Sequence, residues 1–223
     1  MKQLVLDIRP DAPPTLDNFV VGANQELMAA LRDPQALPGH LYLWGPGGCG
    51  RSHLLRAAVD AALKTGRPAA YVDATSVIDE FPQTAGLLLA VDDIQALAPE
   101  AQIGLFNAFN RSRTLGQKLL LAGDAPPLAL ALREDLRTRV GQCLVFEVRP
   151  LDDESRAAIL ATLAARRGLR LADEVIDFLM RHGRRDLPTL LAVLDALDTA
   201  SLERKRAVTL PLLREMMQSG LEI

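Results

Sequence analysis

A glycine-rich stretch between two apolar runs is the feature that most constrains the fold of this chain. The stretch is Trp44-Gly45-Pro46-Gly47-Gly48-Cys49-Gly50-Arg51-Ser52. It follows the phosphate-loop pattern G-x-x-x-x-G-K-[ST] at every fixed position except 51, where arginine replaces lysine. Residues 40–44 predict a buried strand before it and residues 52–63 a helix after it, the context that the pattern requires. The sequence therefore predicts backbone N–H groups that bind phosphate at a helix N-terminus.

Arginine at position 51 changes what this loop can do. The usual lysine is a compact charge that reaches the β- and γ-phosphates, whereas a guanidinium is planar and bulkier. We expect the loop to hold a nucleotide, with Ser52 placed to bind Mg²⁺, and to hydrolyse it slowly. Two plainer explanations stay open. The chain prefers arginine throughout, with lysine only at positions 2, 64, 118 and 205, and a glycine-rich turn need not bind phosphate.

A second motif supports the nucleotide site. Residues 87–91 form a continuous apolar run, typical of a strand buried on both faces, and the run ends in Asp92 and Asp93. A carboxylate at the end of a central parallel strand, beside a phosphate loop, is where such proteins hold Mg²⁺. We expect Asp92 to bind the metal and Asp93 to polarise the attacking water. The alternative is a strand followed by an acidic turn.

Composition limits the class of protein. At 223 residues and 49% hydrophobic content, the chain has room for one ordinary domain and a small second one. Its net charge of −3 does not suggest a general nucleic-acid binder. Cys49 and Cys143 form no metal or disulfide pattern, which suits a cytoplasmic protein. Asp7, Arg9 and Pro10 interrupt the N-terminus, so we expect no signal peptide, and no apolar run approaches the roughly 20 residues of a membrane span.

The pattern along the chain predicts a P-loop α/β domain followed by a small all-helical domain. Strands are expected at 40–44, 69–72, 87–91, 118–122 and 143–148, with helices at 24–32, 52–63 and 101–113. Their alternation indicates a parallel sheet flanked by helices. Four helices are expected afterwards, at 152–167, 172–182, 186–204 and 208–218. We therefore expect a tail over 1–14, an α/β nucleotide-binding domain over 15–150 and a helical lid over 151–223.

This organisation resembles the AAA+ ATPases, and local motifs resemble the DnaA family within them. Those motifs lie at residues 17–22 (Asp-Asn-Phe-Val-Val-Gly), 91–95 (Val-Asp-Asp-Ile-Gln), 120–124 (Leu-Leu-Ala-Gly-Asp), 136–141 (Leu-Arg-Thr-Arg-Val-Gly) and 185–187 (Arg-Asp-Leu). The resemblance implies roles for further residues. They are Val20 and Val21 at the adenine, His53 at the nucleotide, Asp124 as the sensing residue after its strand, Arg139 as an arginine finger and Arg185 as a lid residue reaching the nucleotide.

Each implied role has a plainer alternative. Arg137 and Arg139 could be solvent-facing helix charges, and Arg185 could belong to a cationic helix C-terminus. Asp124 could cap the following turn. If residues 136–141 are helical, the side chains of Arg137 and Arg139 point about 200° apart.

Within the DnaA family, the chain is most similar to the Hda-type regulators. The run Gly50-Arg51-Ser52-His53-Leu54-Leu55, with its arginine, and the run Gly123-Asp124-Ala125-Pro126-Pro127 carry this resemblance. Gln3, Leu4 and Leu6 resemble the short peptide with which such regulators bind the DNA sliding clamp. Asp7-Ile8 departs from the apolar or proline pair expected there, and Val140 replaces a bulkier residue. The peptide could also be a frayed tail or an edge strand.

The resemblance implies a regulator of replication initiation rather than an initiator, because no basic recognition helix follows the last expected helix. The expected cofactors are ADP or ATP with Mg²⁺. The expected partners are DnaA and the sliding clamp, with DNA contacted only through the clamp, a possible homodimer or oligomer, and no membrane. An ATP-hydrolysing helicase loader or DnaA-like ATPase is the rival interpretation. A DNA tether that only binds ATP is disfavoured by the charge.

Overall fold

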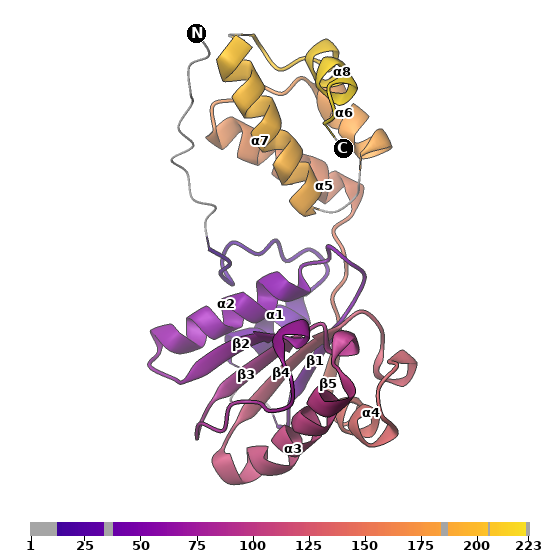
Figure 1. Cartoon of the computed structure of the whole chain (residues 1–223). Helices are drawn as coiled ribbons and strands as arrows, with labels where there is room; N and C mark the ends of the chain where they lie inside the picture. Colours follow the sequence, from indigo (N-terminus) through magenta and orange to yellow (C-terminus); the bar gives the residue numbers. More distant parts are fainter. Residues whose placement is uncertain (1–12, 34–37, 184–186, 205, 222–223) are drawn as a thin grey trace. The chain divides into compact units, whose positions relative to one another are not determined.

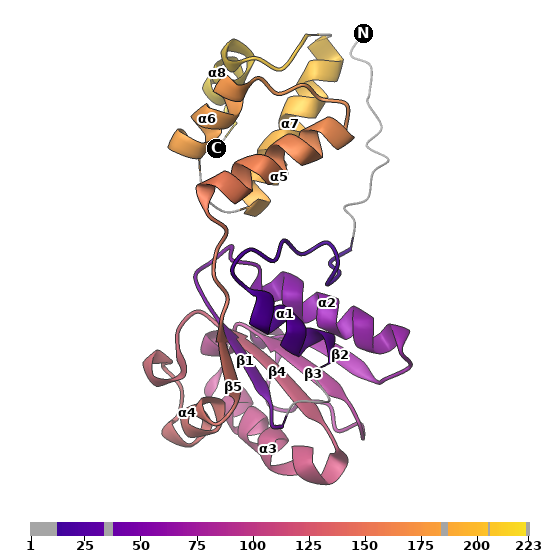
Figure 2. The same cartoon turned by 180° about the vertical axis from the view of Figure 1, so that it is seen from behind.

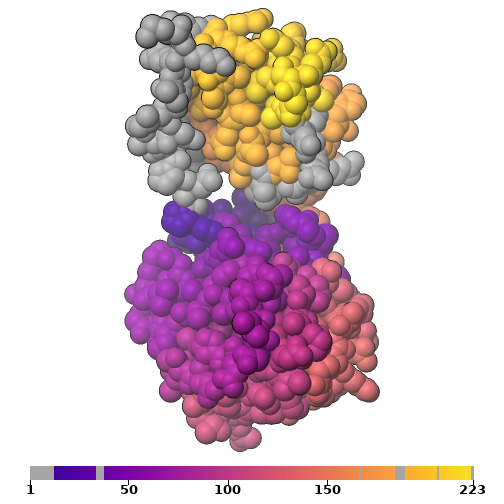
Figure 3. Space-filling view, viewed as in Figure 1, coloured from indigo at the N-terminus to yellow at the C-terminus, as the bar shows by residue number. Residues whose placement is uncertain are grey.

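The computed structural model describes residues 13–33, 38–183, 187–204 and 206–221. They fall into two compact units, the first ending at Pro150 and the second beginning at Leu151. Figure 1 draws the first unit from indigo to salmon and the second from orange to yellow, and Figure 3 shows both with their atoms filled. Within these residues, no helix is long and apolar enough to cross a membrane.

A five-stranded sheet forms the centre of the first unit. All of its strand pairs are parallel, in the order β2-β3-β4-β1-β5. Every residue of β3 and β4 is buried, as expected for central strands covered on both faces. The five predicted strands are confirmed, with ends that differ by at most one residue. They are β1 (Leu41–Trp44), β2 (Ala69–Asp73), β3 (Leu88–Asp92), β4 (Lys118–Gly123) and β5 (Leu144–Glu147).

Helices cover both faces of this sheet, which confirms the predicted α/β architecture (Figures 1 and 2). On one face lie α1 (Gln25–Arg32) and α2 (Arg51–Lys64), and on the other lie α3 (Pro99–Leu115) and α4 (Glu134–Gly141). Side chains alternate along β3, so Leu88 and Ala90 pack on the α2 side while Leu89 and Val91 pack on the α3 side. Short 3-10 turns follow β2, β3 and β4 at Ala74–Ser76, Ile94–Ala96 and Pro127–Ala129.

The second unit is helical in its described residues. It contains α5 (Asp153–Arg166), α6 (Asp173–His182), α7 (Leu187–Arg204) and α8 (Leu210–Gln218), close to the four predicted helices. Its core is aliphatic and draws on all four, with Leu160, Leu179, Leu194 and Leu213 buried together. Asp152 caps α5 by accepting a hydrogen bond from the Ser155 N–H.

A buried asparagine joins the start of the first unit to its end. Asn24 is 4% exposed, and its side-chain nitrogen donates to the carbonyls of Val21 and Arg149, at 3.0 and 2.9 Å. Its side-chain oxygen accepts from the Arg149 N–H at 2.8 Å. The segment before α1 is therefore fixed to the residues that follow β5.

Candidate nucleotide-binding site

The loop between β1 and α2 has the geometry predicted for a phosphate-binding loop. Gly50 precedes α2 with a φ of +102°, a left-handed value that favours glycine, and a side chain there would meet the Phe19 ring at 2.7 Å. A side chain at Gly45 would lie 2.6 Å from the Val148 carbonyl oxygen. Glycine is therefore required at both positions, and the helix begins at Arg51 with its first N–H groups free of an intrahelical acceptor.

The segment that precedes α1 packs against this loop. Phe19 lies beside Gly50, and its ring stacks at an inclined angle on His53, with 5.6 Å between ring centroids. His53 donates from Nε2 to the Thr15 carbonyl at 3.0 Å. Val20, at the surface, and half-buried Val21 follow directly. The residues expected at the adenine are thus brought to the N-terminal end of α2.

Asp92 is held rigidly at the C-terminal end of β3. It is 1% exposed, and both of its carboxylate oxygens accept hydrogen bonds. Oδ1 accepts from the Asp93 N–H at 3.0 Å, and Oδ2 accepts from the Tyr71 hydroxyl at 2.8 Å. Asp93 has a φ of +50°, the one positive value at a non-glycine residue in the described part of the chain.

The arginine of the loop is paired with the second aspartate of the motif. Arg51 Nη2 lies 3.2 Å from Asp93 Oδ1, with the arginine side chain 11% exposed and the aspartate 40% exposed. The other terminal nitrogen of Arg51, Nη1, is buried without a hydrogen-bond partner among the described residues. A buried guanidinium nitrogen left this way is a donor with capacity for an anion.

Gln95 joins this pair to the end of β4. Its Nε2 donates to Asp93 Oδ1 at 3.0 Å, and its Oε1 accepts from the Asp124 N–H at 3.3 Å. The Asp124 side chain itself is exposed. The structure therefore connects Arg51, Asp93 and the backbone of Asp124 through one amide side chain.

These residues fit a nucleotide with Mg²⁺. The loop is open beside Gly47, where an added side chain would meet nothing within 4 Å, and Arg51 offers an unpaired donor. Magnesium usually takes one or two carboxylates, substrate phosphates and waters, so Asp92 and the Ser52 hydroxyl form an appropriate donor set. The described residues contain no group of three or more His, Cys, Asp or Glu that could hold a metal alone.

Similarity to known proteins identifies the family. Residues 153–217 match the family described as "Hda, lid domain". A protein of Haemophilus influenzae (strain Rd) is 34% identical over 97% of this chain and 98% of its own length. Domain III of the Thermotoga maritima replication initiation protein DnaA superposes with a TM-score of 0.79 at 22% identity, over 96% of this chain and 99% of that domain. This chain belongs to the DnaA- and Hda-related AAA+ proteins.

A second similar structure contains an adenine nucleotide analogue. The replication initiator DnaA bound to AMPPCP and single-stranded DNA is 25% identical, with a TM-score of 0.71, over 87% of this chain and 68% of that one.

The expected finger residue lies on α4, on the α3 side of the sheet. Arg139 is half-buried, and its Nη2 donates to Asn110 Oδ1 on α3 at 3.0 Å. Its guanidinium carbon also lies 5.7 Å from the centroid of the Phe106 ring. Because α4 is a helix, Arg137 points about 200° away from Arg139, so the two arginines face different surroundings.

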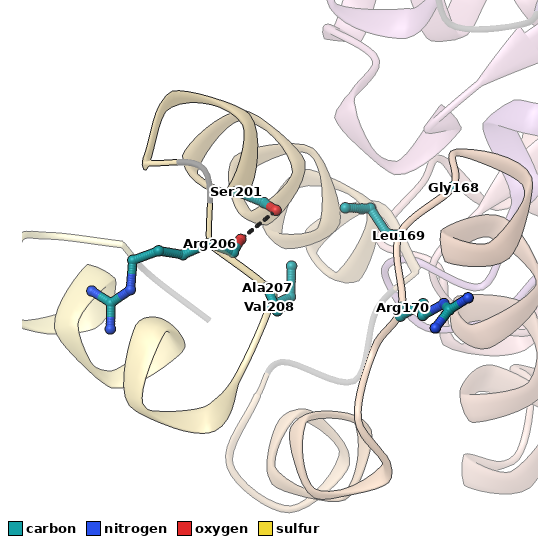
Figure 4. A pocket seen from close by; sticks show the side chains of 7 residues that line it. All are labelled: Gly168, Leu169, Arg170, Ser201, Arg206, Ala207 and Val208. Carbon is teal, nitrogen blue, oxygen red and sulfur yellow. Dashed lines mark hydrogen bonds between the residues drawn. The ribbon is translucent and has the colours of Figure 1, made fainter.

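Four predicted site residues lie outside the described residues: Gln3, Leu4 and Leu6 of the expected clamp peptide, and Arg185 of the lid. The lid of this AAA+ protein does contain a surface hollow of about 360 Å³, lined by residues 168–170, Ser201 and residues 206–208. Figure 4 shows Leu169, Ala207 and Val208 at its centre, while the guanidinium groups of Arg170 and Arg206 point away. No polar side chains converge in this hollow.

Three residues of the site were not predicted from the sequence. The Tyr71 hydroxyl donates a hydrogen bond to Asp92, and Arg56 donates one to Tyr71. Gln95 forms hydrogen bonds with both the Asp93 side chain and the Asp124 N–H. A partial signal existed for Arg56, which lies one helical turn after Ser52 and therefore on the same side of α2.

Proposed function

We propose that this AAA+ protein regulates chromosomal replication initiation by promoting hydrolysis of the ATP bound to DnaA. The main support is the match of residues 153–217 to the Hda lid family, together with 25% identity to the replication initiator DnaA over 87% of this chain. In this proposal, residues 15–150 form the nucleotide-binding domain and residues 151–223 the lid. The protein's own nucleotide, ADP or ATP with Mg²⁺, serves as a structural cofactor.

The pairing of Arg51 with Asp93 supports a site that binds nucleotide without rapid turnover. Asp93 is the acid expected to polarise the attacking water, and its Oδ1 accepts from both Arg51 and Gln95. These two hydrogen bonds engage the carboxylate oxygen that a water would otherwise approach. The loop's cation is directed at that acid, so it contributes less to the phosphates. Both effects slow hydrolysis at this protein's own site.

Arg139 supplies the chemistry at DnaA in this proposal. A finger donated in trans neutralises charge on the transferred phosphoryl group and is worth roughly 10³–10⁵ in rate, or about 4–7 kcal/mol. Arg139 must first leave Asn110 and Phe106. A hydrogen bond from a charged group, about 1.5–3 kcal/mol, and a cation–π contact of about 0.5–1 kcal/mol are lost in that step. The gain exceeds this cost, so the contacts to α3 are compatible with a finger.

The sliding clamp is the proposed platform for the reaction. Gln3 would hydrogen-bond at the rim of the clamp's pocket, and Leu4 and Leu6 would bury apolar area in it. This brings the protein to DNA through the clamp, which agrees with its net charge of −3. A homodimer or higher oligomer, using AAA+ packing, is part of the proposal.

One experiment tests the whole proposal. DnaA loaded with radiolabelled ATP is incubated with this protein, with clamp loaded on DNA, with both, or with neither. Conversion of DnaA-ATP to DnaA-ADP should require this protein and loaded clamp together. The rival, an ATP-hydrolysing helicase loader, is supported instead if the protein alone turns over free ATP at about one per second while DnaA-ATP is unaffected.

A further inference from the structure

We propose that Tyr71 is a positioning residue that orients Asp92 toward the Mg²⁺ of a bound nucleotide. The inference rests on the nucleotide site proposed above and concerns side chains behind that site. It is carried by an unbroken chain of contacts from α2 through β2 to β3: Arg56 to Tyr71, and Tyr71 to Asp92.

The register of the sheet places Tyr71 on the correct side of Asp92. In the parallel pair of β2 and β3, Tyr71 is opposite Ala90 and Asp73 is opposite Asp92. Tyr71 and Ala90 pack in the same cluster beneath α2, and alternation puts Asp92 on that face as well. The long tyrosine side chain covers the two-residue offset, so its hydroxyl reaches Asp92 Oδ2 at 2.8 Å.

The second contact fixes the direction of that hydrogen bond. Arg56 Nη2 donates to the Tyr71 hydroxyl oxygen at 3.2 Å, and its guanidinium carbon lies 4.7 Å from the centroid of the same ring. Arginine has no acceptor, so the single hydroxyl proton of Tyr71 is left for Asp92. A tyrosine hydroxyl is protonated at neutral pH, so this proton stays in place.

This arrangement restricts how Asp92 can meet a metal. The Tyr71 hydroxyl and the Asp93 N–H each donate to one oxygen of the Asp92 carboxylate, which fixes the plane of that carboxylate. The remaining lone pairs of the two oxygens are then left for a metal. Ser52 lies one turn before Arg56, on the same side of α2. Partners that orient a ligand in this way are typically worth 10–100-fold in metal affinity.

Tyr71→Phe is the sharpest test, because it keeps the ring, its packing and the cation–π contact while removing only the hydroxyl. Two quantities are measured on the full chain. One is Mn²⁺ binding to the ADP complex, followed by the EPR signal of free Mn²⁺. The other is ADP affinity in EDTA, measured by calorimetry. We expect Mn²⁺ affinity to fall 10–100-fold and ADP affinity in EDTA to change by less than about twofold.

Tyr42→Phe is the matched control. Tyr42 is also a strand tyrosine, but its hydroxyl donates to the Ala125 carbonyl at 2.5 Å, and its ring packs in the cluster on the α3 side. This variant should lower the melting temperature and leave Mn²⁺ affinity unchanged. A loss of Mn²⁺ affinity in both variants would mean that the effect comes from a general loosening of the fold, and it would overturn the inference.

Two results separate the inference from the proposed site beneath it. If the wild-type ADP complex binds Mn²⁺ and Tyr71→Phe binds it equally well, the role of Tyr71 is wrong while the site stands. If the wild-type complex binds no Mn²⁺, the metal site is wrong, and the role of Tyr71 is overturned with it.

Discussion

Arg51 Nη2 lies 3.2 Å from Asp93 Oδ1, so the residue that replaces the usual lysine contacts the residue expected to activate water. The two positions are 42 residues apart in the chain and meet at the ends of α2 and β3. The substitution at position 51 therefore affects two parts of the site at once. It changes the cation that is available to phosphate. It also places a hydrogen-bond donor on the carboxylate of Asp93.

Arg51→Lys should raise the protein's own ATP turnover by roughly 10-fold or more, equivalent to about 1.4 kcal/mol of barrier. The shorter ammonium can reach the phosphates, and Asp93 is then free to polarise water. Asp93→Asn is the matched control, since it also breaks the pair but removes the acid. It should bind ADP about 2–5-fold more tightly at low salt, without faster turnover. Single-turnover ATP hydrolysis is measured for both variants. Equal rates in Arg51→Lys and Asp93→Asn would mean that the pairing of Arg51 with Asp93 does not limit hydrolysis.

Asp92→Ala should weaken Mg²⁺-dependent nucleotide binding while the fold remains intact. The change removes the expected metal ligand and leaves the Tyr71 hydroxyl able to turn toward water. Calorimetric titration of ADP with Mg²⁺ and with EDTA measures the metal-dependent part directly, and circular dichroism monitors the fold. Equal loss under both conditions would mean that Asp92 serves the loop rather than the metal.

Arg139→Ala should abolish stimulation of DnaA's ATP hydrolysis, a loss of roughly 10³–10⁵ in rate, while nucleotide and clamp binding persist. The physical reason is the loss of a charge placed at the γ-phosphate of the neighbouring molecule. Arg139→Lys should rescue little, because a point charge replaces a planar bidentate donor. Conversion of DnaA-ATP to DnaA-ADP is the measurement.

Arg137→Ala is the internal control for this prediction, because α4 directs Arg137 about 200° away from Arg139. It should stimulate DnaA normally. If Arg137→Ala fails to stimulate DnaA's ATP hydrolysis and Arg139→Ala stimulates it normally, the finger is Arg137, two residues from the assigned position. Normal stimulation by both variants would exclude a donated finger.

Replacing Gln3 and Leu4 together by alanine should abolish binding to the sliding clamp. The leucines are each worth about 1.5–3 kcal/mol if fully buried, and a short peptide pays ordering entropy, so wild-type affinity should be moderate. Surface-binding measurements with immobilised clamp test this, with Asp11→Ala as a control outside the peptide. Unchanged binding by the double variant would remove the peptide from the proposal.

His40 should make stability depend on pH. Burial, followed by the charge of Lys118, lowers the pKa of His40 to about 4, from an ordinary value near 6.5. Its Nδ1 accepts from the Leu119 N–H, a bond that a protonated ring cannot keep. The unfolded chain takes up the proton first as pH falls, so this stability is complete above about pH 6.5 and is lost toward pH 4. Urea unfolding should show a loss of about 1–2 kcal/mol between pH 7 and 5, and His40→Gln should remove that dependence.

The sheet and most helices were predictable because their signals are local. Continuous apolar runs located β3 and β4, and the glycine pattern located the start of α2 to within one residue. The sequence also pointed to both Arg51 and Asp93. Their pairing was not predicted, because it depends on where a long side chain turns after the helix begins.

The supporting residues were not predictable for the same reason. Tyr71 contacts Asp92 only because β2 and β3 pair in one particular register, and a shift by one residue would turn it to the opposite face. Asn110 meets Arg139 only through the packing of α3 against α4. Neither contact has a spacing along the chain that would reveal it.

The bonds between Asn24 and Arg149 determine where backbone rotation can begin between the sheet and the helices that follow. Because Asn24 binds both the N–H and the carbonyl of Arg149, neither backbone torsion of that residue is free to change. The next residue is Pro150, whose ring fixes its φ. The first soft torsion is therefore ψ of Pro150, and the pivot for any lid rotation starts at that single bond.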